Sequence, residues 1–294
     1  MSVSILSSTV FASISQTSNE QNISTLDIQH PLFTASVSLY GGQVLSWKPT
    51  GQDDVFWLSK ATEFKEGKAI RGGIPLCWPW FGPNIDDKGN NGGNHGFART
   101  NQWQLVSHEI TEQEVTLVIE LNGEGKHYLW PAKFKLLQTL VFSTTFNQKL
   151  TITNLTSEKV NFSSALHSYF KVSNPEDVRV PKLVDALFDD KITGQKQQTD
   201  SLVNCIGPID RIYYCSDEQV IIDECLRRKI LIESNQCQQW VLWNPGQEIA
   251  ENMIDIHHHG ENDFVCLEAA NTQWQSIDAG ERVTLSQKIT VSTL

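Results

Sequence analysis

Apolar and polar residues alternate with a period of two over much of this chain, and no other feature constrains its fold as strongly. Successive side chains of a β-strand point to opposite faces, so this alternation is typical of strands with one buried face. The clearest segments span 114–123, 134–145, 149–155, 229–234 and 282–292. Turn signals rich in Gly, Asn and Pro separate them, which favours antiparallel pairing.

The fold class follows from what accompanies these strands. Helical periodicity is scarce, and residues 181–190 (PKLVDALFDD) form the best short helical candidate. There is no rhythm of strand and helix that would indicate a parallel sheet. A chain of 294 residues can build a single all-β domain. We therefore predict a large antiparallel β-sandwich with few short helices over 27–294, after a loosely ordered Ser/Thr-rich segment, 1–26.

The charge and the cysteines narrow the classes of partner. A formal net charge of −11 without a basic run argues against binding to nucleic acid or to an anionic membrane. Six cysteines without a Cys-x-x-Cys pair indicate free thiols in a reducing cytoplasm rather than structural zinc. No cationic leader and no apolar run of membrane-spanning length is present. We expect a cytoplasmic monomer that binds a small molecule.

Residues 71–84, RGGIPLCWPWFGPN, join a cation, two glycines and a rigid aromatic stretch. The C–H faces of a pyranose pack on aromatic rings, while its hydroxyl groups need polar partners. Trp78 and Trp80 in this stretch, and Trp243 further along the chain, are therefore candidates for a sugar-binding platform. The alternative is that these rings form a hydrophobic plug between sheet edges.

Two strand-like segments each carry one ionisable side chain. In 160–172, His167 alternates away from the apolar positions, and an imidazole with a pKa of about 6.5 can exchange protons near neutral pH. In 263–271, Glu268 is a lone carboxylate in an apolar strand. Burying a carboxylate costs free energy unless it is hydrogen-bonded, or it serves as a general base. The alternatives are a half-exposed structural histidine and an outward-facing glutamate on an edge strand.

A second cation follows in NHGFART, residues 94–100. An extended conformation would place His95 and Arg99 on one face. With Arg71, Arg99 flanks the aromatic stretch, and two guanidinium groups near one pocket indicate an anionic group on the ligand. Two surface salt bridges are the alternative. The adjacent histidines at 257–259 have no metal-ligand spacing, and we expect no metal there.

Seven segments in their order along the chain resemble the hexose-6-phosphate mutarotases (glucose-6-phosphate 1-epimerases) of the aldose 1-epimerase superfamily: GGQVLSWKP, RGGIPLCWPWFGP, NHGFAR, ALHSYFKV, DRIY, WNPG and FVCLEAA. The resemblance implies a galactose-mutarotase-like β-sandwich that interconverts the α and β anomers of a hexose 6-phosphate without metal or organic cofactor. It implies His167 and Glu268 as the catalytic pair. It also implies substrate-binding positions, which are Arg71, Asn94, His95, Arg99 and Asp210.

Exchange of anomers requires ring opening, rotation about C1–C2 and closure on the other face. We assign Glu268 as general base at the C1 hydroxyl and protonated His167 as general acid at the ring oxygen, which predicts a bell-shaped pH profile. Arg71 and Arg99 would hold the 6-phosphate. The glycines after Arg71 would let the backbone approach that phosphate.

Three other functions stay open from the residues alone. They are a mutarotase for an unphosphorylated aldose, a non-catalytic carbohydrate-binding protein on the same fold, and a glycosidase with two carboxylates. The two arginines count against the first, and the retained His/Glu pair counts against the second. A carboxylate paired with a histidine fits the geometry of a glycosidase poorly.

Overall fold

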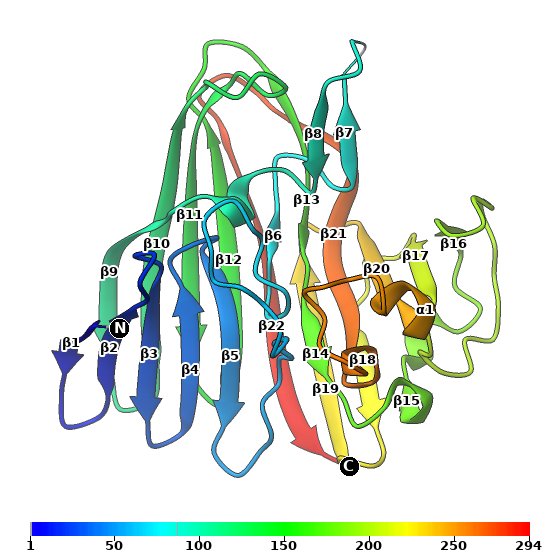
Figure 1. Ribbon diagram of the computed structural model, residues 1–294, viewed down its shortest axis with the longest axis horizontal. Helices are drawn as coiled ribbons and strands as arrows, with labels where there is room; N and C mark the ends of the chain where they lie inside the picture. The colour runs from blue at the N-terminus through cyan, green and yellow to red at the C-terminus, as the bar shows by residue number, and fades with distance from the viewer. Residues whose placement is uncertain (1, 87) are drawn as a thin grey trace.

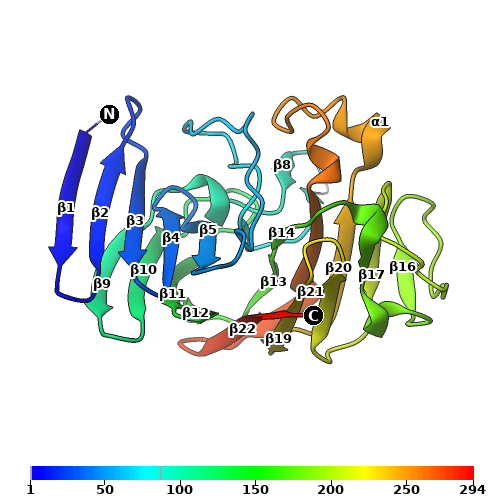
Figure 2. The same ribbon diagram turned by 90° about the horizontal axis from the view of Figure 1, so that it is seen from below.

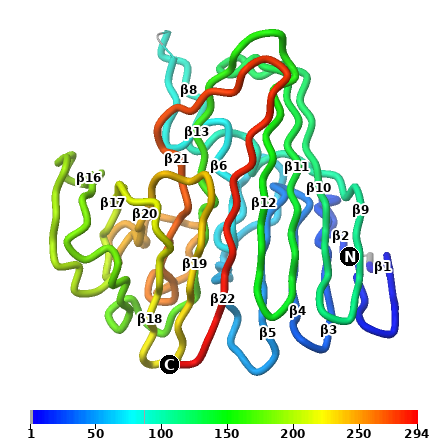
Figure 3. The backbone as a smooth tube through the Cα atoms, turned by 180° about the vertical axis from the view of Figure 1, so that it is seen from behind, coloured from blue at the N-terminus to red at the C-terminus, as the bar shows by residue number. Residues whose placement is uncertain are grey.

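The computed structural model describes residues 2–86 and 88–294, which form a sandwich of antiparallel sheets (Figure 1). The largest sheet has eight strands in the order β15-β18-β19-β22-β12-β11-β10-β9, and Figure 3 shows β22 between β12 and β19. Its strands are β9 (Gln104–Ile110), β10 (Val115–Glu124), β11 (Lys133–Phe142), β12 (Thr145–Asn154), β15 (Val178–Arg179), β18 (Gln219–Asp223), β19 (Arg228–Asn235) and β22 (Arg282–Thr293).

A five-stranded sheet in chain order covers the β9–β12 half of the large sheet (Figure 2). The ring of Phe33 lies 6.2 Å from that of Phe142 across the two layers. Burial of such aromatic rings is a main source of cohesion between packed sheets. The strands are β1 (Ser2–Ser8), β2 (Ser13–Ser18), β3 (Ser24–His30), β4 (Phe33–Ser38) and β5 (Gln43–Pro49).

A seven-stranded sheet carries the features that matter for function. Its order is β16-β17-β20-β21-β13-β6, and β14 also pairs with β21. On β21, Val265 and Leu267 belong to the same core cluster as Leu285 of β22, so one face of this sheet packs on the large sheet. The other face is free of that core. The strands are β6 (Leu76–Cys77), β13 (Val160–Leu166), β14 (Tyr169–Lys171), β16 (Phe188–Asp190), β17 (Ile209–Tyr213), β20 (Gln239–Asn244) and β21 (Phe264–Ile277).

Short elements complete the fold. The strands β7 (Pro83–Ile85) and β8 (Asn91–Asn94) form a separate hairpin, and the α-helix α1 spans Gly246–Ala250. The 3₁₀ helices are η1 (Ala98–Thr100), η2 (Pro175–Asp177), η3 (Pro181–Leu183) and η4 (Gly260–Asn262). Among the described residues no helix has the length and apolar character needed to cross a membrane. The prediction of an antiparallel β-sandwich with few short helices is confirmed.

Two local expectations differ from the structure. The helical candidate 181–190 yields only η3 and the strand β16, because its last residues pair with β17. The start of the chain, expected to be loosely ordered, forms β1 and β2. Ile14 of β2 is fully buried, which anchors these strands, although the side chain of Ile5 on β1 remains exposed. The domain boundary at residue 26 stays a prediction.

Candidate active site

The face of the seven-stranded sheet that points away from the core bears a cavity of about 290 Å³. Strands supply its floor, and loops from distant parts of the chain supply its walls. Polar and charged side chains predominate, as expected where a small polar ligand binds. The lining residues are Arg71, Phe81, Gly82, Pro83, Asn94, His95, Arg99, His167, Lys191, Asp210, Val241, Trp243, Met253 and Glu268.

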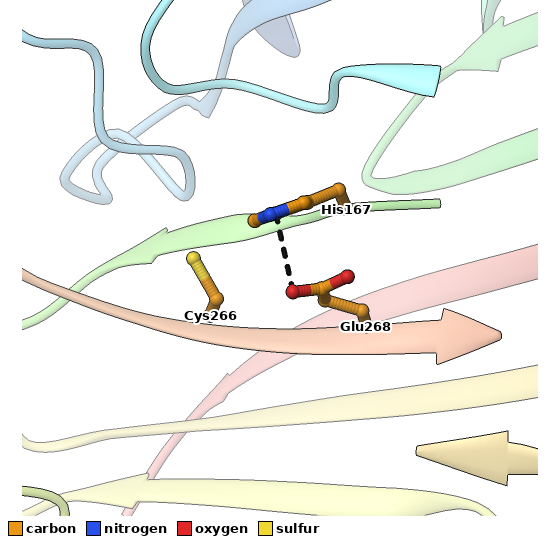
Figure 4. A group of neighbouring side chains, drawn as sticks. All are labelled: His167, Cys266 and Glu268. Atoms are coloured by element: carbon orange, nitrogen blue, oxygen red, sulfur yellow. Dashed lines mark ion pairs between the residues drawn. The ribbon is translucent and has the colours of Figure 1, made fainter. Parts of the chain in front are cut away.

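His167 and Glu268 meet at the floor of this cavity. His167 follows directly after β13, Glu268 lies within β21, and these two strands are hydrogen-bonded neighbours. The Nδ1 atom of His167 is 3.3 Å from Oε1 of Glu268 (Figure 4). The imidazole also stacks on the ring of Tyr169, with centroids 4.9 Å apart and planes 7° from parallel. The pair is thus held in a defined orientation.

Burial shifts both members of this pair away from their charged forms. Desolvation raises the pKa of Glu268 well above its usual 4.5, and nearby Asp210 adds to the effect. Desolvation lowers the pKa of His167 well below 6.5, and His95 and Arg99 act in the same direction. Both shifts therefore disfavour an ion pair of imidazolium and carboxylate at the floor of the cavity.

Arg71 lines the cavity, but two side chains already occupy its guanidinium. Its Nε and one terminal nitrogen bind the Oδ2 of Asp255 at 3.0 and 2.9 Å. The other terminal nitrogen donates to the Tyr169 hydroxyl at 2.8 Å. The positive charge of Arg71 is therefore partly compensated before any ligand enters.

Arg99 and Lys191 are the less engaged cations of the wall. Within residues 2–86 and 88–294, neither has a carboxylate within ion-pair distance. Arg99 donates one bond to the backbone oxygen of Asn94 at 2.8 Å, and its buried Nε has no partner among the described residues. The Lys191 amide donates to the backbone oxygen of Asp210 at 2.8 Å, which places these two residues side by side at the cavity wall. Burial raises the pKa of Asp210, and Lys191 opposes the rise.

His95 enters the cavity from a sharp turn, not from the extended segment that the sequence predicts. Its φ is 65°, and a Cβ on the following Gly96 would lie 2.0 Å from the Trp78 oxygen, so only glycine fits there. Burial, with Arg99 next, lowers the pKa of His95 to about 3. The neutral ring accepts from the Gly82 amide at Nδ1, 3.2 Å away, which leaves Nε2 as a donor.

The aromatic stretch has two roles. Trp78 and Trp80 are almost fully buried and line no part of the cavity; Trp78 packs edge-on against Trp130, 4.8 Å away. The structure thus does not support Trp78 as a sugar contact, because its ring lies in the core between layers. Phe81 and Trp243 lie in the wall instead. The plug interpretation describes the first two rings, and the platform role stays a prediction for Trp243.

The glycines after Arg71 serve packing. A Cβ on Gly72 would lie 2.4 Å from the Trp57 oxygen, and one on Gly73 would lie 2.1 Å from the Val44 oxygen. Both residues have positive φ. They let the backbone pass close to two neighbouring segments, so the expected role of approaching a phosphate has no support here.

Of the residues proposed from the sequence, the structure gathers all but Trp78 and Trp80 around one cavity. Lys191 and Met253 are wall residues that the sequence did not indicate. Lys191 lies in a polar loop without any motif, and the sequence marks it only by the two aspartates that precede it. Asp255, which compensates Arg71, was missed because 184 positions separate the two residues.

Comparison with known proteins gives a consistent result. Residues 24–290 match the family described as Aldose 1-epimerase. The chain is 36% identical over 291 residues to a protein of Escherichia coli named "Putative glucose-6-phosphate 1-epimerase", with 96% of each covered. The crystal structure of a "putative mutarotase (YeaD)" from Salmonella typhimurium is similar, with a TM-score of 0.87, 33% identity, and 99% and 97% of the chains covered. A "galactose mutarotase-like protein" from Clostridium acetobutylicum shares the fold at 15% identity, with a TM-score of 0.75 and 97% and 100% covered.

Proposed function

The chain belongs to the aldose 1-epimerase family, and from that premise we propose that it interconverts the α and β anomers of a hexose 6-phosphate, with glucose 6-phosphate as the first substrate to test. One observation carries the proposal. His167 and Glu268 lie 3.3 Å apart at the floor of a cavity whose wall presents cations. An acid/base pair suits ring opening, and the cations suit a phosphate.

The proposed chemistry begins with a proton on the carboxyl of Glu268 and a neutral His167 imidazole. Transfer of that proton from Glu268 Oε1 to His167 Nδ1 generates a carboxylate and an imidazolium. The carboxylate then removes the proton of the C1 hydroxyl, while the imidazolium gives its Nε2 proton to the ring oxygen as the bond from C1 to that oxygen breaks. The open aldehyde rotates about C1–C2, and the reverse transfers close the ring on the other face.

A bound phosphate assists the first transfer, because its negative charge favours the imidazolium. We assign the phosphate to Arg99 and Lys191, whose charges are least compensated, with Arg71 at the side where Asp255 and Tyr169 hold it. Asp210, Asn94 and the Nε2 donor of His95 would orient the sugar hydroxyls. Positioning of this kind is worth as much as proton transfer, since it holds C1 against the pair.

The cellular setting is part of the proposal. All six cysteines are free among the described residues, which suits a reducing compartment, and we assign the enzyme to the cytoplasm as a monomer. No cofactor enters the proposed steps.

The test follows conversion of pure α-glucose 6-phosphate with a coupled enzyme that detects only the β anomer. Glu268→Gln and His167→Ala are each expected to lower kcat at least about 100-fold, since a positioned proton transfer contributes about 10²–10⁴ in rate. Circular dichroism and thermal melting verify that both variants fold.

Near wild-type turnover in either folded variant would contradict the assigned mechanism. Free glucose and galactose are assayed in parallel. An equal or higher kcat/KM for a free sugar would contradict the assignment of a phosphorylated substrate while leaving the acid/base pair intact.

A further inference from the structure

Cys266 is an ionisable side chain beside the catalytic pair that the proposed mechanism does not use. It lies two residues before Glu268 on β21, so both side chains project from the same face of the sheet. Figure 4 shows its sulfur beside the carboxylate, below the ring of His167. One ligand atom from each of these three residues lies within 4.8 Å of the other two.

These donor atoms are buried and poorly satisfied. Glu268 is 1% exposed, and its Oε2 has no hydrogen-bond partner among the described residues. The Nδ1 of His167 lies near Oε1 of Glu268 but forms no hydrogen bond of good geometry within the same residues. Buried polar atoms are nearly always partnered, so unpartnered atoms on two side chains beside a buried thiol point to a ligand that joins the three residues.

We propose that His167, Cys266 and Glu268 form a binding site for Zn²⁺ that inhibits the enzyme. Nitrogen, thiolate sulfur and carboxylate oxygen are the three ligand types of zinc, and zinc sites with three protein ligands keep a fourth position open. His167 and Glu268 line the cavity, so that fourth position faces it. A thiolate ligand disfavours Mg²⁺ and Ca²⁺, which prefer oxygen.

The geometry requires only small movements. Bonds of about 2.0–2.3 Å place two donors of a tetrahedral zinc roughly 3.5 Å apart. The His167–Glu268 separation of 3.3 Å already meets this value, and the third donor needs to approach by an ångström or so. The metal takes a thiolate and a carboxylate, so binding releases to solvent the thiol proton of Cys266 and the carboxyl proton of Glu268.

Inhibition follows because zinc occupies the atoms that exchange protons. With its lone pairs on the metal, Glu268 cannot accept the C1 proton and His167 cannot carry one. The inhibition depends on the proposed function, whereas the binding of zinc does not. Zinc is thus an inhibitor in this proposal and plays no part in turnover.

Binding is tested directly, without an activity assay. Zinc chloride is titrated into the full-length protein in competition with a chromophoric chelator. Replacement of Zn²⁺ by Co²⁺ then reports thiolate ligation through the sulfur-to-cobalt charge-transfer band. Cys266→Ala removes the sulfur, and Cys237→Ala is the matched control, a buried cysteine outside the cavity.

We expect one tightly bound Zn²⁺ in the wild type and in Cys237→Ala, with the cobalt band present. Groups that only orient a metal ligand cost 10- to 100-fold in affinity when removed, so loss of the sulfur itself is expected to weaken binding about 100-fold or more. Equal zinc affinity in Cys266→Ala, or no charge-transfer band in the wild type, would overturn the site. The charge-transfer band is measured on the wild type, so that test does not depend on whether a variant folds.

Inhibition is measured separately in the anomer assay. We expect micromolar zinc to slow the wild type and Cys237→Ala, chelator to restore the rate, and Mg²⁺ to have no effect. Zinc binding without loss of rate would overturn the inhibitory role alone, and a protein that binds zinc but lacks mutarotase activity would contradict the proposed function instead.

Discussion

Lys191 brings a positive charge to the cavity wall, and the nearby residues compensate it little. Its ammonium group lies 5.7 Å from the centre of the Phe81 ring, and it has no carboxylate within ion-pair distance in the described part of the chain. We therefore propose a phosphate as the partner of this lysine. The exposure of the side chain limits the strength of such a contact, because water screens it.

Lys191→Ala is expected to raise KM for the hexose phosphate about 10-fold and to leave kcat within about twofold, as for the loss of one partly screened charge-assisted bond. Rates with free glucose should not change. Lys196→Ala is the control, since Lys196 lies in the same loop but pairs with Asp189. An unchanged KM would contradict the assignment of Lys191 to the phosphate.

The pKa shifts of His167 and Glu268, the proposed catalytic pair, predict how the rate depends on pH. Because burial lowers the pKa of His167 below 6.5, the pair accepts a second proton only at a pH below that value. Because burial raises the pKa of Glu268 well above 4.5, the pair loses its last proton only at a pH well above that value. We expect kcat at saturating substrate to persist as the pH falls through 6.5 and to decline at both extremes. A loss of kcat centred on pH 6.5 would show an unshifted histidine instead.

At the scale of elements, the segment from Arg71 to β6 is held by close backbone contacts. Gly73 has a φ of 63° and no room for a Cβ, whereas Gly67 has a φ of 80° and nothing within 4 Å of its Cβ position. Alanine substitutions at these two positions therefore separate two costs. Steric overlap arises only at Gly73, whereas the strain of a left-handed backbone arises at both.

Gly67→Ala is expected to cost about 1–2 kcal/mol of unfolding free energy, the strain of a left-handed residue. Gly73→Ala adds about 1–3 kcal/mol for overpacking, and it should also reduce activity because it displaces Arg71. Urea denaturation of both variants measures the difference. Equal stabilities would contradict a packing role for Gly73.

The elements also show where local reasoning fails. The sequence NPGQE reads as a turn but begins α1 at Gly246, while the helical candidate 181–190 is largely strand and loop. Both are short, and short segments follow their neighbours more than their own propensities. Long alternating strands such as β10 and β22 are recognisable because many residues repeat the same pattern.

At the scale of the molecule, the proposed active site and the N-terminal strands are far apart. Figure 1 shows β1 and β2 at one side of the sandwich, and β13, β20 and β21 toward the other. The exposed side chains of β1 add little buried surface, but Ile14 of β2 lies within the core.

Removal of residues 1–10 is thus expected to leave kcat/KM within about twofold and to lower the melting temperature by a few degrees. Removal of residues 1–18 should cost at least a further 1.5–3 kcal/mol, roughly the burial of one isoleucine. Thermal melts and the anomer assay measure both effects. A large loss of activity on removal of 1–10 would contradict the separation of site and N-terminal strands.

The sequence by itself determined the β-sandwich and the faces of its strands. On β21, Val265 and Leu267 enter the core and Glu268 faces the cavity, as their alternation predicts. Side chains of an extended strand alternate whatever surrounds them, so this information is local. Only the tertiary structure decided that Trp78 is buried, that Asp255 holds Arg71, and that Lys191 reaches the cavity. These contacts join segments far apart in the chain, and packing between layers rather than any local pattern selects them.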